Sequence, residues 1–428
     1  HQFPYRTASG GLYDSGDYSA ALERTLELVD YERWRQRQRE LRQRGRYVGI
    51  GLGLAVEPSG SNMGYVTVAE PPDERAGRLP KSGCTDPATV AIDPAGGITV
   101  RLTSLPQGQG HETAAAQIVA EELGCDPADV TVVTQMDTFT RPWTVSSGSY
   151  SSRFAPLTAS AVLLAARGLK ERLRRLAAHF LDVPAERLIF EDGVFVDKAD
   201  PGRRISLRRV AGAVHWNPTS LPPGEEPRLE ETVFFSMDEA APPDEADRVD
   251  SSVTYGFVSE AVVVEVDVET GAVRILDYVS VHDAGRVLNP LLANGQIYGG
   301  ALHGLGAALL EELRYGPDGQ LLTGTFVDYP CPTAAEAPDI RIEHLESPSP
   351  LTPLGAKGLG EGSTMAVPAA IANAVADALA PLGVEVDCLP LTPHRVWDLI
   401  HTAAGGDGPA GRPAAGDGGN ERRGGDAW

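Results

Sequence analysis

The stretch VSEAVVVEVDVETGAVRILDYVSVHD, residues 258–283, consists of two apolar, valine-rich runs joined by the turn residues ETG. Runs of this kind around a turn are typical of a β-hairpin with a buried face. Apolar residues at helical spacing follow over 295–313 and again over 366–379. The C-terminal half of the chain is therefore predicted to fold as a hairpin followed by helices.

Similar elements precede this hairpin. The stretch YVGIGLGLAVE, residues 47–57, predicts a buried strand, and ATVAIDPAGGITVRL, residues 88–102, predicts two strands around a Pro/Gly turn. Apolar residues over 112–123 then indicate a helix, which leads to a strand at 130–133 and a long helix over 157–181. The order of elements, without a residue-level repeat, indicates two related α/β units.

The rest of the chain divides around these units. Residues 18–45 predict one highly charged amphipathic helix that Gly45 ends, with its arginines on the surface. Residues rich in Pro, Glu and Asp favour a long surface excursion between the units, and the Gly-rich tail is expected to be disordered. The predicted segments are an N-terminal helical segment at 1–45, a first α/β unit at 46–199, the excursion at 200–250, a second α/β unit at 251–402 and the tail at 403–428.

The composition excludes several classes of function. The chain has 428 residues, 42% of them hydrophobic, which is enough to bury a large core. A formal net charge of −22 disfavours binding to the phosphate backbone of a nucleic acid. The 4 cysteines show no CxxC spacing, which argues against a disulfide framework, a zinc site or an iron–sulfur cluster in this chain.

No apolar run reaches the roughly 18–20 residues that span a bilayer, and the N-terminus lacks the charged-then-apolar pattern of a secretion signal. We therefore expect a cytoplasmic chain without a membrane span. The sequence starts at His1 and continues as QFPYRTASGG, which resembles the interior of a longer protein. Processing, a split gene or a truncated sequence would each produce this start.

The first motif with chemical content is GQGHET, residues 108–113. Gly108 and Gly110 flank Gln109 directly before a predicted helix, where glycine allows a ligand close to the backbone and the helix N-terminus attracts an anion. Gln109 both donates and accepts hydrogen bonds. Ordinary helix capping explains the same pattern, and His111 and Glu112 are expected as first-turn residues rather than metal ligands.

The second motif is KGLGEG, residues 357–362, in which glycines surround Lys357 and Glu361 before an alanine-rich helix. A carboxylate on such a loop, partly shielded by apolar neighbours, suits a general base. A turn whose Glu361 only interacts favourably with the helix dipole is the alternative. The spacing by itself does not decide between these two interpretations.

A third segment, GQIYGGALHGLG, residues 295–306, places five glycines in a predicted helix. Each glycine in a helix interior lowers helix stability by about 1 kcal/mol relative to alanine. Close packing on a neighbouring helix or close approach to a flat cofactor would offset this loss of stability. Asp283 and Asn289 just before it are interpreted as turn formers.

In a fourth segment, SGSYSSR at 147–153, the hydroxyls either bind phosphate or cap the following helix.

In this order the segments resemble the xanthine dehydrogenase and aldehyde oxidase family, and within it the aerobic carbon monoxide dehydrogenase large-subunit group. The resemblance extends from about residue 3 to 400 and also includes FPYRTASGGLYDSGDY, FVDYPCPTA and LPLTPHRVW. It implies an α+β molybdopterin-binding fold of repeated mixed sheet-and-helix units, of which this chain supplies only the second pair.

The resemblance also implies roles for individual residues. Glu361 matches the glutamate beside molybdenum that acts as the base, and the GQG loop matches the contact to the molybdopterin and the oxo side of the metal. SGSYSSR matches a loop for the phosphate-bearing tail of the cofactor. The implied cofactor-binding residues are Gly108, Gln109, Gly110, Ser149, Ser151, Ser152, Arg153, Gln296, His303, Lys357, Gly358 and Gly360. Molybdenum would be held through the pterin, without a protein ligand.

The implied activity is a molybdenum-dependent hydroxylase or dehydrogenase, which inserts water-derived oxygen at an electrophilic carbon of a small molecule. Molybdopterin cytosine dinucleotide is the expected cofactor. Electrons would pass to 2Fe-2S and FAD groups in partner subunits, and the N-terminal half of the large subunit would come from the same gene or a separate chain. Carbon monoxide, aldehydes, purines and N-heterocycles all stay open as substrates.

Three positions depart from the family pattern: His303 stands where glutamine is usual, Tyr298 where histidine is usual, and Ser151 where glycine is frequent. These departures favour either a tuned substrate pocket or a non-catalytic scaffold or assembly subunit that has lost the metal. A phosphate-binding nucleotide module ranks last, because the sequence carries no Walker lysine or Rossmann acidic residue at the right spacing.

Overall fold

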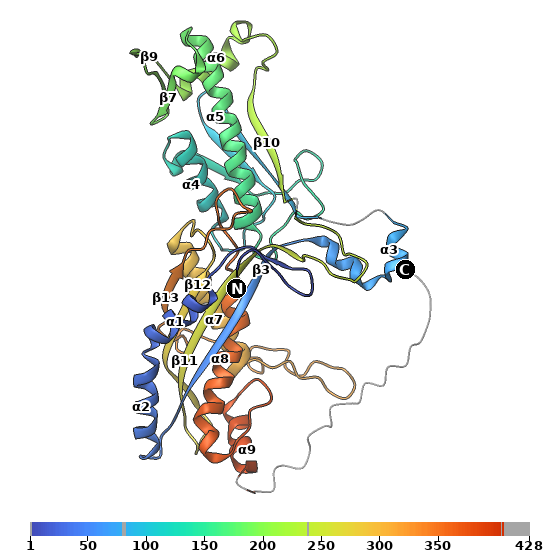
Figure 1. Cartoon of the computed structure of the whole chain (residues 1–428), viewed down its shortest axis with the longest axis vertical. Coiled ribbons are helices and arrows are strands. Elements are labelled where there is room, and N and C mark those ends of the chain that lie inside the picture. Colours follow the sequence, from blue (N-terminus) through green and yellow to red (C-terminus); the bar gives the residue numbers. More distant parts are fainter. Residues whose placement is uncertain (1, 79–82, 238, 404, 406–428) are drawn as a thin grey trace.

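The computed structural model describes residues 2–78, 83–237, 239–403 and 405. Mixed sheets with helices on their faces form an elongated molecule, with one sheet towards each end of the long axis (Figure 1). Nearly all of the expected disordered tail at 403–428 lies outside the described residues. The predicted α+β class is confirmed.

The central sheet of the C-terminal half has the strand order β13-β12-β11-β3. The predicted hairpin at 258–283 is its centre, because β11 and β12 pair antiparallel from Phe257↔Asp283 to Val266↔Val273. β13 is parallel to β12, and β3 is antiparallel to β11. The bounds are β3 Tyr47–Ser61, β11 Ser252–Val266, β12 Val273–Asp283 and β13 Arg341–Leu345.

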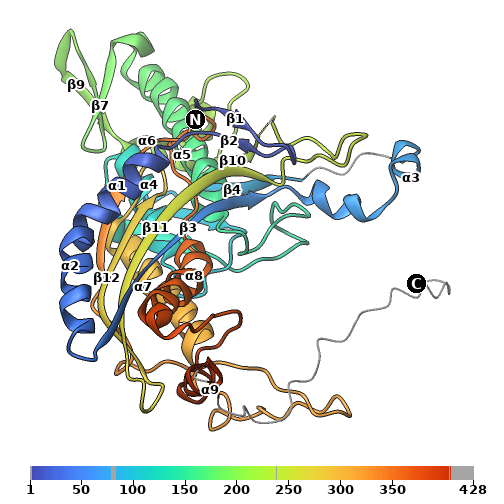
Figure 2. The same ribbon diagram turned by 60° about the horizontal axis from the view of Figure 1, so that its bottom comes forward.

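Helices cover both faces of this sheet (Figure 2). One pair packs on the face that carries Val48, Ile50 and Val263, and the other pair packs on the face that carries Val262 and Val264. The first pair is α1 Tyr18–Val29 and α2 Tyr31–Arg42, and the second is α7 Pro290–Leu309 and α8 Gly362–Leu379, with α9 Pro393–Ala403 beyond them.

The second large sheet has the order β10-β4-β5-β6 and buries the longest helix, α5, and α4 in one apolar cluster. A small sheet of order β7-β8-β9 and a two-stranded β1-β2 pair complete the chain. The bounds are β4 Thr85–Ile92, β5 Ile98–Leu102, β6 Val130–Val133, β10 Leu229–Ser236, α4 His111–Leu123, α5 Ala159–Leu181, α6 Leu207–Trp216, α3 Pro72–Ala76, β7 Leu188–Glu191, β8 Val194–Asp197, β9 Asp200–Ser206, β1 Tyr5–Arg6 and β2 Leu12–Tyr13.

The sheets correct two of the expected segment boundaries. β3 was expected in the first unit but lies in the sheet of the second unit, beside β11. Residues 200–250, expected as a surface excursion, supply β9, α6 and the edge strand β10. Leu229, Val233 and Phe235, which lie on the same side of β10, pack on the core. The surrounding Pro and Glu residues obscure this alternation in the sequence.

The N-terminal helix is also different from the prediction. Asp30, with a left-handed φ of 54°, separates α1 from α2 where one helix was expected. The arginines of α2 are not all on the surface, since Arg35 Nη1 lies 2.6 Å from Asp377 Oδ2 and Arg42 Nη2 donates to the Asp377 carbonyl. Asp377 Oδ2 also accepts from the Ile50 amide at 2.9 Å. These bonds join α2, β3 and α8.

The contact between β3 and α8 brings backbone against backbone. A Cβ added at Gly49, Gly51 or Gly53 would lie 2.0, 1.9 or 2.2 Å from a carbonyl oxygen of α8. These oxygens belong to residues spaced four apart along the helix, Ala374, Ala370 and Ala366. The alternating glycines of YVGIGLGLAVE therefore provide a flat strip on which the helix lies.

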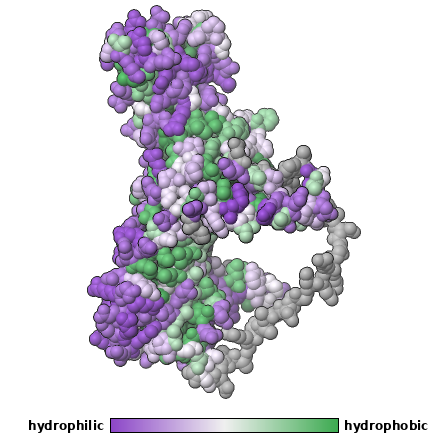
Figure 3. Space-filling view, viewed as in Figure 1, coloured by the Kyte–Doolittle hydropathy of each residue, from purple (hydrophilic) through white to green (hydrophobic). Residues whose placement is uncertain are grey.

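One segment, Gly362–Leu382, is long and apolar enough to cross a membrane by length and composition, contrary to the expectation from the sequence. Most of it is α8, whose residues Val367, Ile371 and Val375 are buried in the core between the sheet and α7. On the surface, polar residues dominate the upper end and the lower left of the molecule, and apolar residues lie in patches between them (Figure 3).

We expect Gly51→Ala to destabilise the protein by about 1–3 kcal/mol, because its Cβ would overlap the backbone of α8. Thermal unfolding of the purified protein measures this change. Gly324→Ala is the matched control, since an added Cβ there meets nothing within 4 Å. Equal stability of both variants would show that α8 does not rest on the strand as described.

Candidate active site

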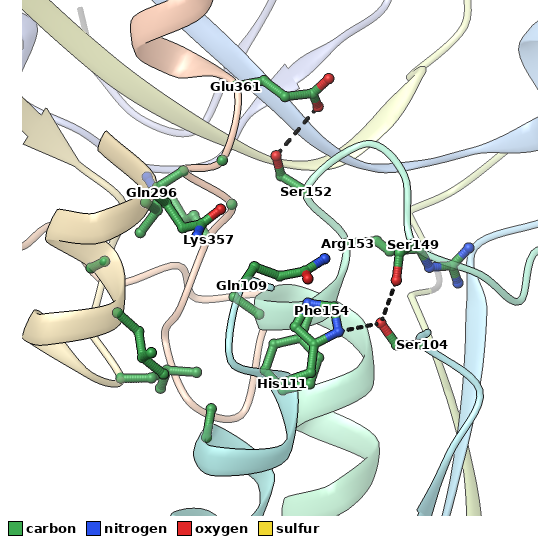
Figure 4. Close-up of a pocket in the computed structure, with 18 of the residues that line it drawn as sticks. Ser104, Gln109, His111, Ser149, Ser152, Arg153, Phe154, Gln296, Lys357 and Glu361 are labelled. Carbon is green, nitrogen blue, oxygen red and sulfur yellow. Dashed lines mark hydrogen bonds between the residues drawn. The ribbon is translucent and has the colours of Figure 1, made fainter. Parts of the chain in front are cut away.

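The four motifs converge on one cavity of about 350 Å³ (Figure 4). Its walls are the loop before α4, the loop before α5, the start of α7 and the loop before α8. Of the predicted residues, the cavity is lined by Gln109, Ser149, Ser151, Ser152, Arg153, Gln296, Lys357, Gly358, Gly360 and Glu361. Segments up to 250 residues apart in the sequence thus form one site.

The GQG loop needs its glycines. Gly108 and Gly110 have φ values of +100° and +78°, which side chains rarely adopt. A Cβ at Gly110 would also lie 2.6 Å from Leu292 Cδ2, whereas Gly108 has open space around it. Gln109 is half-buried on the cavity wall, and its Oε1 accepts from the Gln107 amide. The first N–H groups of α4 follow directly.

His111 joins the start of α4 to the π-helical turn that precedes α5. Its ring stacks on Phe154 at 4.0 Å, and its Nδ1 lies 3.0 Å from Ser104 Oγ. Burial lowers the pKa of His111 to about 4, against the smaller effects of Ser104 and Glu112. The imidazole is therefore neutral near pH 7. The interpretation of His111 as a first-turn residue agrees with this geometry.

The serines of the loop before α5 do not cap a helix. Ser151 and Ser152 adopt left-handed φ values of 52° and 43°, and neither α5 nor the π-helical turn at Phe154–Thr158 has a side-chain cap. Ser149 Oγ lies 3.2 Å from Ser104 Oγ and donates to the Leu105 carbonyl. The left-handed backbone at Ser151 explains why glycine suits this position.

Two of the predicted cofactor-binding residues, Arg153 and Lys357, have cationic groups that bond to other parts of the protein and not to the cavity. The Arg153 guanidinium is buried and donates to the Tyr150 hydroxyl at 2.9 Å and the Thr85 carbonyl at 3.1 Å. Lys357 Nζ donates to the carbonyls of Ser15 at 2.8 Å and Tyr255 at 3.1 Å, and burial lowers its pKa. These two charges hold the loops together, and only the rest of each residue lines the cavity.

Glu361 lies between this cavity and a second one of about 540 Å³. Its side chain is exposed rather than shielded, makes no capping bond to α8 and lies 3.3 Å from Ser152 Oγ through Oε2. Gln296 lines both cavities, while His303 lines only the second. Since Glu361 does not cap α8, its carboxylate is available to a ligand in either cavity.

The glycines of α7 differ in what surrounds them. A Cβ at Gly304 would lie 2.8 Å from Val367 Cβ, so this glycine allows close packing on α8. Gly295 and Gly299 have open space instead and line the second cavity. Asn289, interpreted from the sequence as a turn former, is instead the N-cap of α7, where its side chain accepts from the Leu292 amide at 3.1 Å.

Sequence reasoning missed two charged residues of this site. Arg286 is exposed and lines the first cavity, and only its place just before α7 could have suggested it. Glu57 is 2% exposed at the end of β3, where its Oε1 accepts from the Glu361 amide at 2.9 Å. A glutamate on the glycine-bearing face of a buried strand was the available signal.

The chain also matches known proteins in sequence and in fold. Residues 24–338 match the molybdopterin cofactor-binding domain family. The carbon monoxide dehydrogenase large chain of Hydrogenophaga pseudoflava is 35% identical, over 93% of this chain and 46% of that protein. The nicotine 6-hydroxylase large subunit of Paenarthrobacter nicotinovorans is 34% identical, over 92% and 45%.

The solved structure of quinoline 2-oxidoreductase from Pseudomonas putida 86 has a TM-score of 0.78 at 36% identity, covering 93% of this chain and 48% of that chain. The chain thus spans about half the length of the relatives it matches. The sequence resemblance to molybdenum hydroxylases is confirmed. The chain belongs to the molybdopterin cofactor-binding domain family.

Proposed function

We propose that this chain holds a molybdopterin cofactor in the first cavity and supplies Glu361 as the general base of a molybdenum-dependent hydroxylase or dehydrogenase. The observation that carries the proposal is the convergence of the GQG loop, the serine loop, the start of α7 and the KGLGEG loop on one cavity. In the sequence, each of these segments alone also had a purely structural explanation, and for the serine loop and Glu361 the structure shows no such helix cap. Their meeting around a single cavity with a carboxylate at its edge favours the functional one.

The groups on the cavity wall suit a polar heterocycle that carries phosphate. The N-terminus of α4 and the nearby hydroxyl of Ser151 provide hydrogen-bond donors, and an α-helix N-terminus favours anions. Arg286 adds a positive charge to the same cavity in a chain whose formal net charge is −22. Gln109 and Gln296 add amide groups that both donate and accept. A cytosine dinucleotide form of the cofactor is consistent with these phosphate-binding groups.

When bound, the molybdenum cofactor supplies the oxygen-transfer and two-electron chemistry of the reaction. Glu361 accepts the proton released as oxygen is transferred to the substrate carbon, and its exposed carboxylate between the two cavities leaves room for a substrate. Gly358 and Gly360 line the same cavity, and the absence of side chains there lets the loop that carries Glu361 pack directly on the serine loop.

The remaining parts of the enzyme would come from partners. Several large apolar side chains are exposed, among them Phe139 at 94%, Phe326 at 85% and Val327 at 89%. A partner that covers these side chains would remove their apolar surface from water. We propose that the N-terminal half of the large subunit covers it, and that electrons leave through a 2Fe-2S subunit and an FAD subunit.

The names of the relatives give a substrate panel. They include enzymes named for carbon monoxide, nicotine, quinoline and xanthine. Each of these molecules has an electrophilic carbon atom that suits this reaction. Turnover of each with an artificial electron acceptor, together with an aldehyde, defines the substrate class.

Metal and subunit analysis tests the proposal as a whole. A complex isolated from the native host through a tag on this chain is expected to contain about one molybdenum per chain, together with iron and co-purifying subunits. Mass spectrometry and elemental analysis measure both. An intact complex without molybdenum would instead support the non-catalytic scaffold or assembly subunit.

Glu361→Gln is expected to reduce turnover by about 10²–10⁴-fold while leaving molybdenum content unchanged, because an amide does not accept the proton at neutral pH. Steady-state kinetics and elemental analysis of the same preparation measure the two effects. Glu121→Gln, on the exposed side of α4, is the matched control. Full turnover in Glu361→Gln would remove Glu361 from the reaction.

Arg286→Gln is expected to lower cofactor retention, since it removes a positive charge from the cavity that would hold phosphate. Molybdenum per chain after dialysis measures retention, with Arg204→Gln on the remote strand β9 as the control. A molybdenum content equal to that of the control would show that Arg286 does not contact the cofactor.

A further inference from the structure

Strand β3 contacts the KGLGEG loop through two side chains on one face. Glu57 Oε1 accepts from the Glu361 amide at 2.9 Å, and Ser59 Oγ accepts from the Gly358 amide at 3.0 Å. Side chains two residues apart on a strand point to the same side, and this is the side that carries the glycines under α8. The strand therefore holds the loop at both ends, directly before the helix that it also supports.

Ser152 connects Glu57 to the side chain of Glu361. Its hydroxyl donates to Glu57 Oε1 at 2.8 Å and lies 3.3 Å from Glu361 Oε2 (Figure 4). A hydroxyl has one proton to donate and lone pairs to accept with. With Glu361 as a carboxylate, this one proton bonds either Glu57 or Glu361 at a time. When Glu361 holds a proton, the same oxygen accepts from it and donates to Glu57.

The loop packs closely on β3 and on the serine loop. A Cβ at Gly358 would lie 2.4 Å from Ser59 Cβ and 2.5 Å from Ser152 Cβ. A Cβ at Gly362 would lie 2.8 Å from Glu57 Oε2. Glycine at both positions lets the loop lie directly on the strand and the serine loop.

Burial of the Glu57 carboxylate needs compensating hydrogen bonds, because burying an isolated carboxylate costs much free energy. Burial raises its pKa, while the hydrogen bonds from the Glu361 backbone and Ser152 and the nearby His282 lower it. A second buried carboxylate, Glu260, accepts from Ser363 at 2.7 Å beneath the same helix start and does not contact Glu361 in this way. Among these acids, Glu57 is the one bonded to the Glu361 backbone.

We propose that Glu57 is a positioning residue for Glu361, holding its backbone directly and its side chain through Ser152. The proposal rests on the proposed role of Glu361 as the base. Positioning of a catalytic group within a fraction of an ångström affects the rate of the chemical step more than substrate binding. Glu57 is thus expected to affect kcat rather than KM.

The test compares Glu57→Met, which keeps the volume but removes the acceptor, with Glu57→Gln, which keeps an acceptor oxygen. In the purified complex, Glu57→Met is expected to speed hydrogen exchange of the Glu361 amide about tenfold, the effect of losing one buried hydrogen bond. It is also expected to lower kcat at least about tenfold with little change in KM. Glu57→Gln is expected to restore slow exchange and most of the turnover.

Asp197→Asn is the matched control, because Asp197 is a fully buried carboxylate bonded to Arg187 in the remote sheet of β8. It should leave exchange at 357–365 unchanged. Ser152→Ala serves as a second variant if Glu57→Met does not fold, and it is expected to lower kcat while the Glu361 amide stays protected.

The outcomes separate this proposal from the proposed function. Unchanged exchange and turnover in Glu57→Met, in a complex that Glu361→Gln inactivates, would overturn positioning alone. Fast exchange in Glu57→Met, in a complex that turns over no substrate and holds no molybdenum, would support positioning of the loop and overturn the catalytic assignment. Equal loss in Glu57→Gln and Glu57→Met would show that the charge, and not the acceptor, is required.

Discussion

The close contact between β3 and α8 is the constraint on which the site depends. Gly49, Gly51 and Gly53 place the strand backbone directly against the carbonyls of the helix. Any side chain at these positions would increase the distance between strand and helix. The same face of the strand continues to Glu57 and Ser59, which accept from the loop that starts the helix. One strand thus fixes the position of α8 and, at its far end, the position of Glu361. Fold stability and site geometry share one set of contacts.

The site also shows a division between charges that hold the protein together and charges available to a ligand. Arg153 and Lys357 are buried, and their cationic groups are occupied by carbonyl oxygens and neighbouring acids. Buried charges require such partners, because the interior does not solvate them. Arg286 and Glu361 are exposed on the cavity wall. The exposed pair, one of each sign, carries the proposed chemistry of phosphate binding and proton transfer.

Much of this architecture was predictable from local patterns. The hairpin at 258–283, the strands at 47–57 and 88–102 and the long helix before Leu181 follow from apolar period and turn residues, which are properties of neighbouring residues. The pattern failed where distant residues decide the outcome. Strand β10 forms because β4 offers it an edge, and the break at Asp30 allows α2 to reach Asp377.

The sequence by itself determined the types of the elements and the residue types that are suited to a molybdopterin site, because period, glycine content and motif order are local. Only the tertiary structure decided that the four motifs share one cavity, that Ser151 and Ser152 face it instead of capping a helix, and that Glu57 lies under Glu361. These facts depend on distances between residues about 50 to 300 positions apart along the chain. Such distances are set by how sheets and helices pack, and packing is a property of the whole chain.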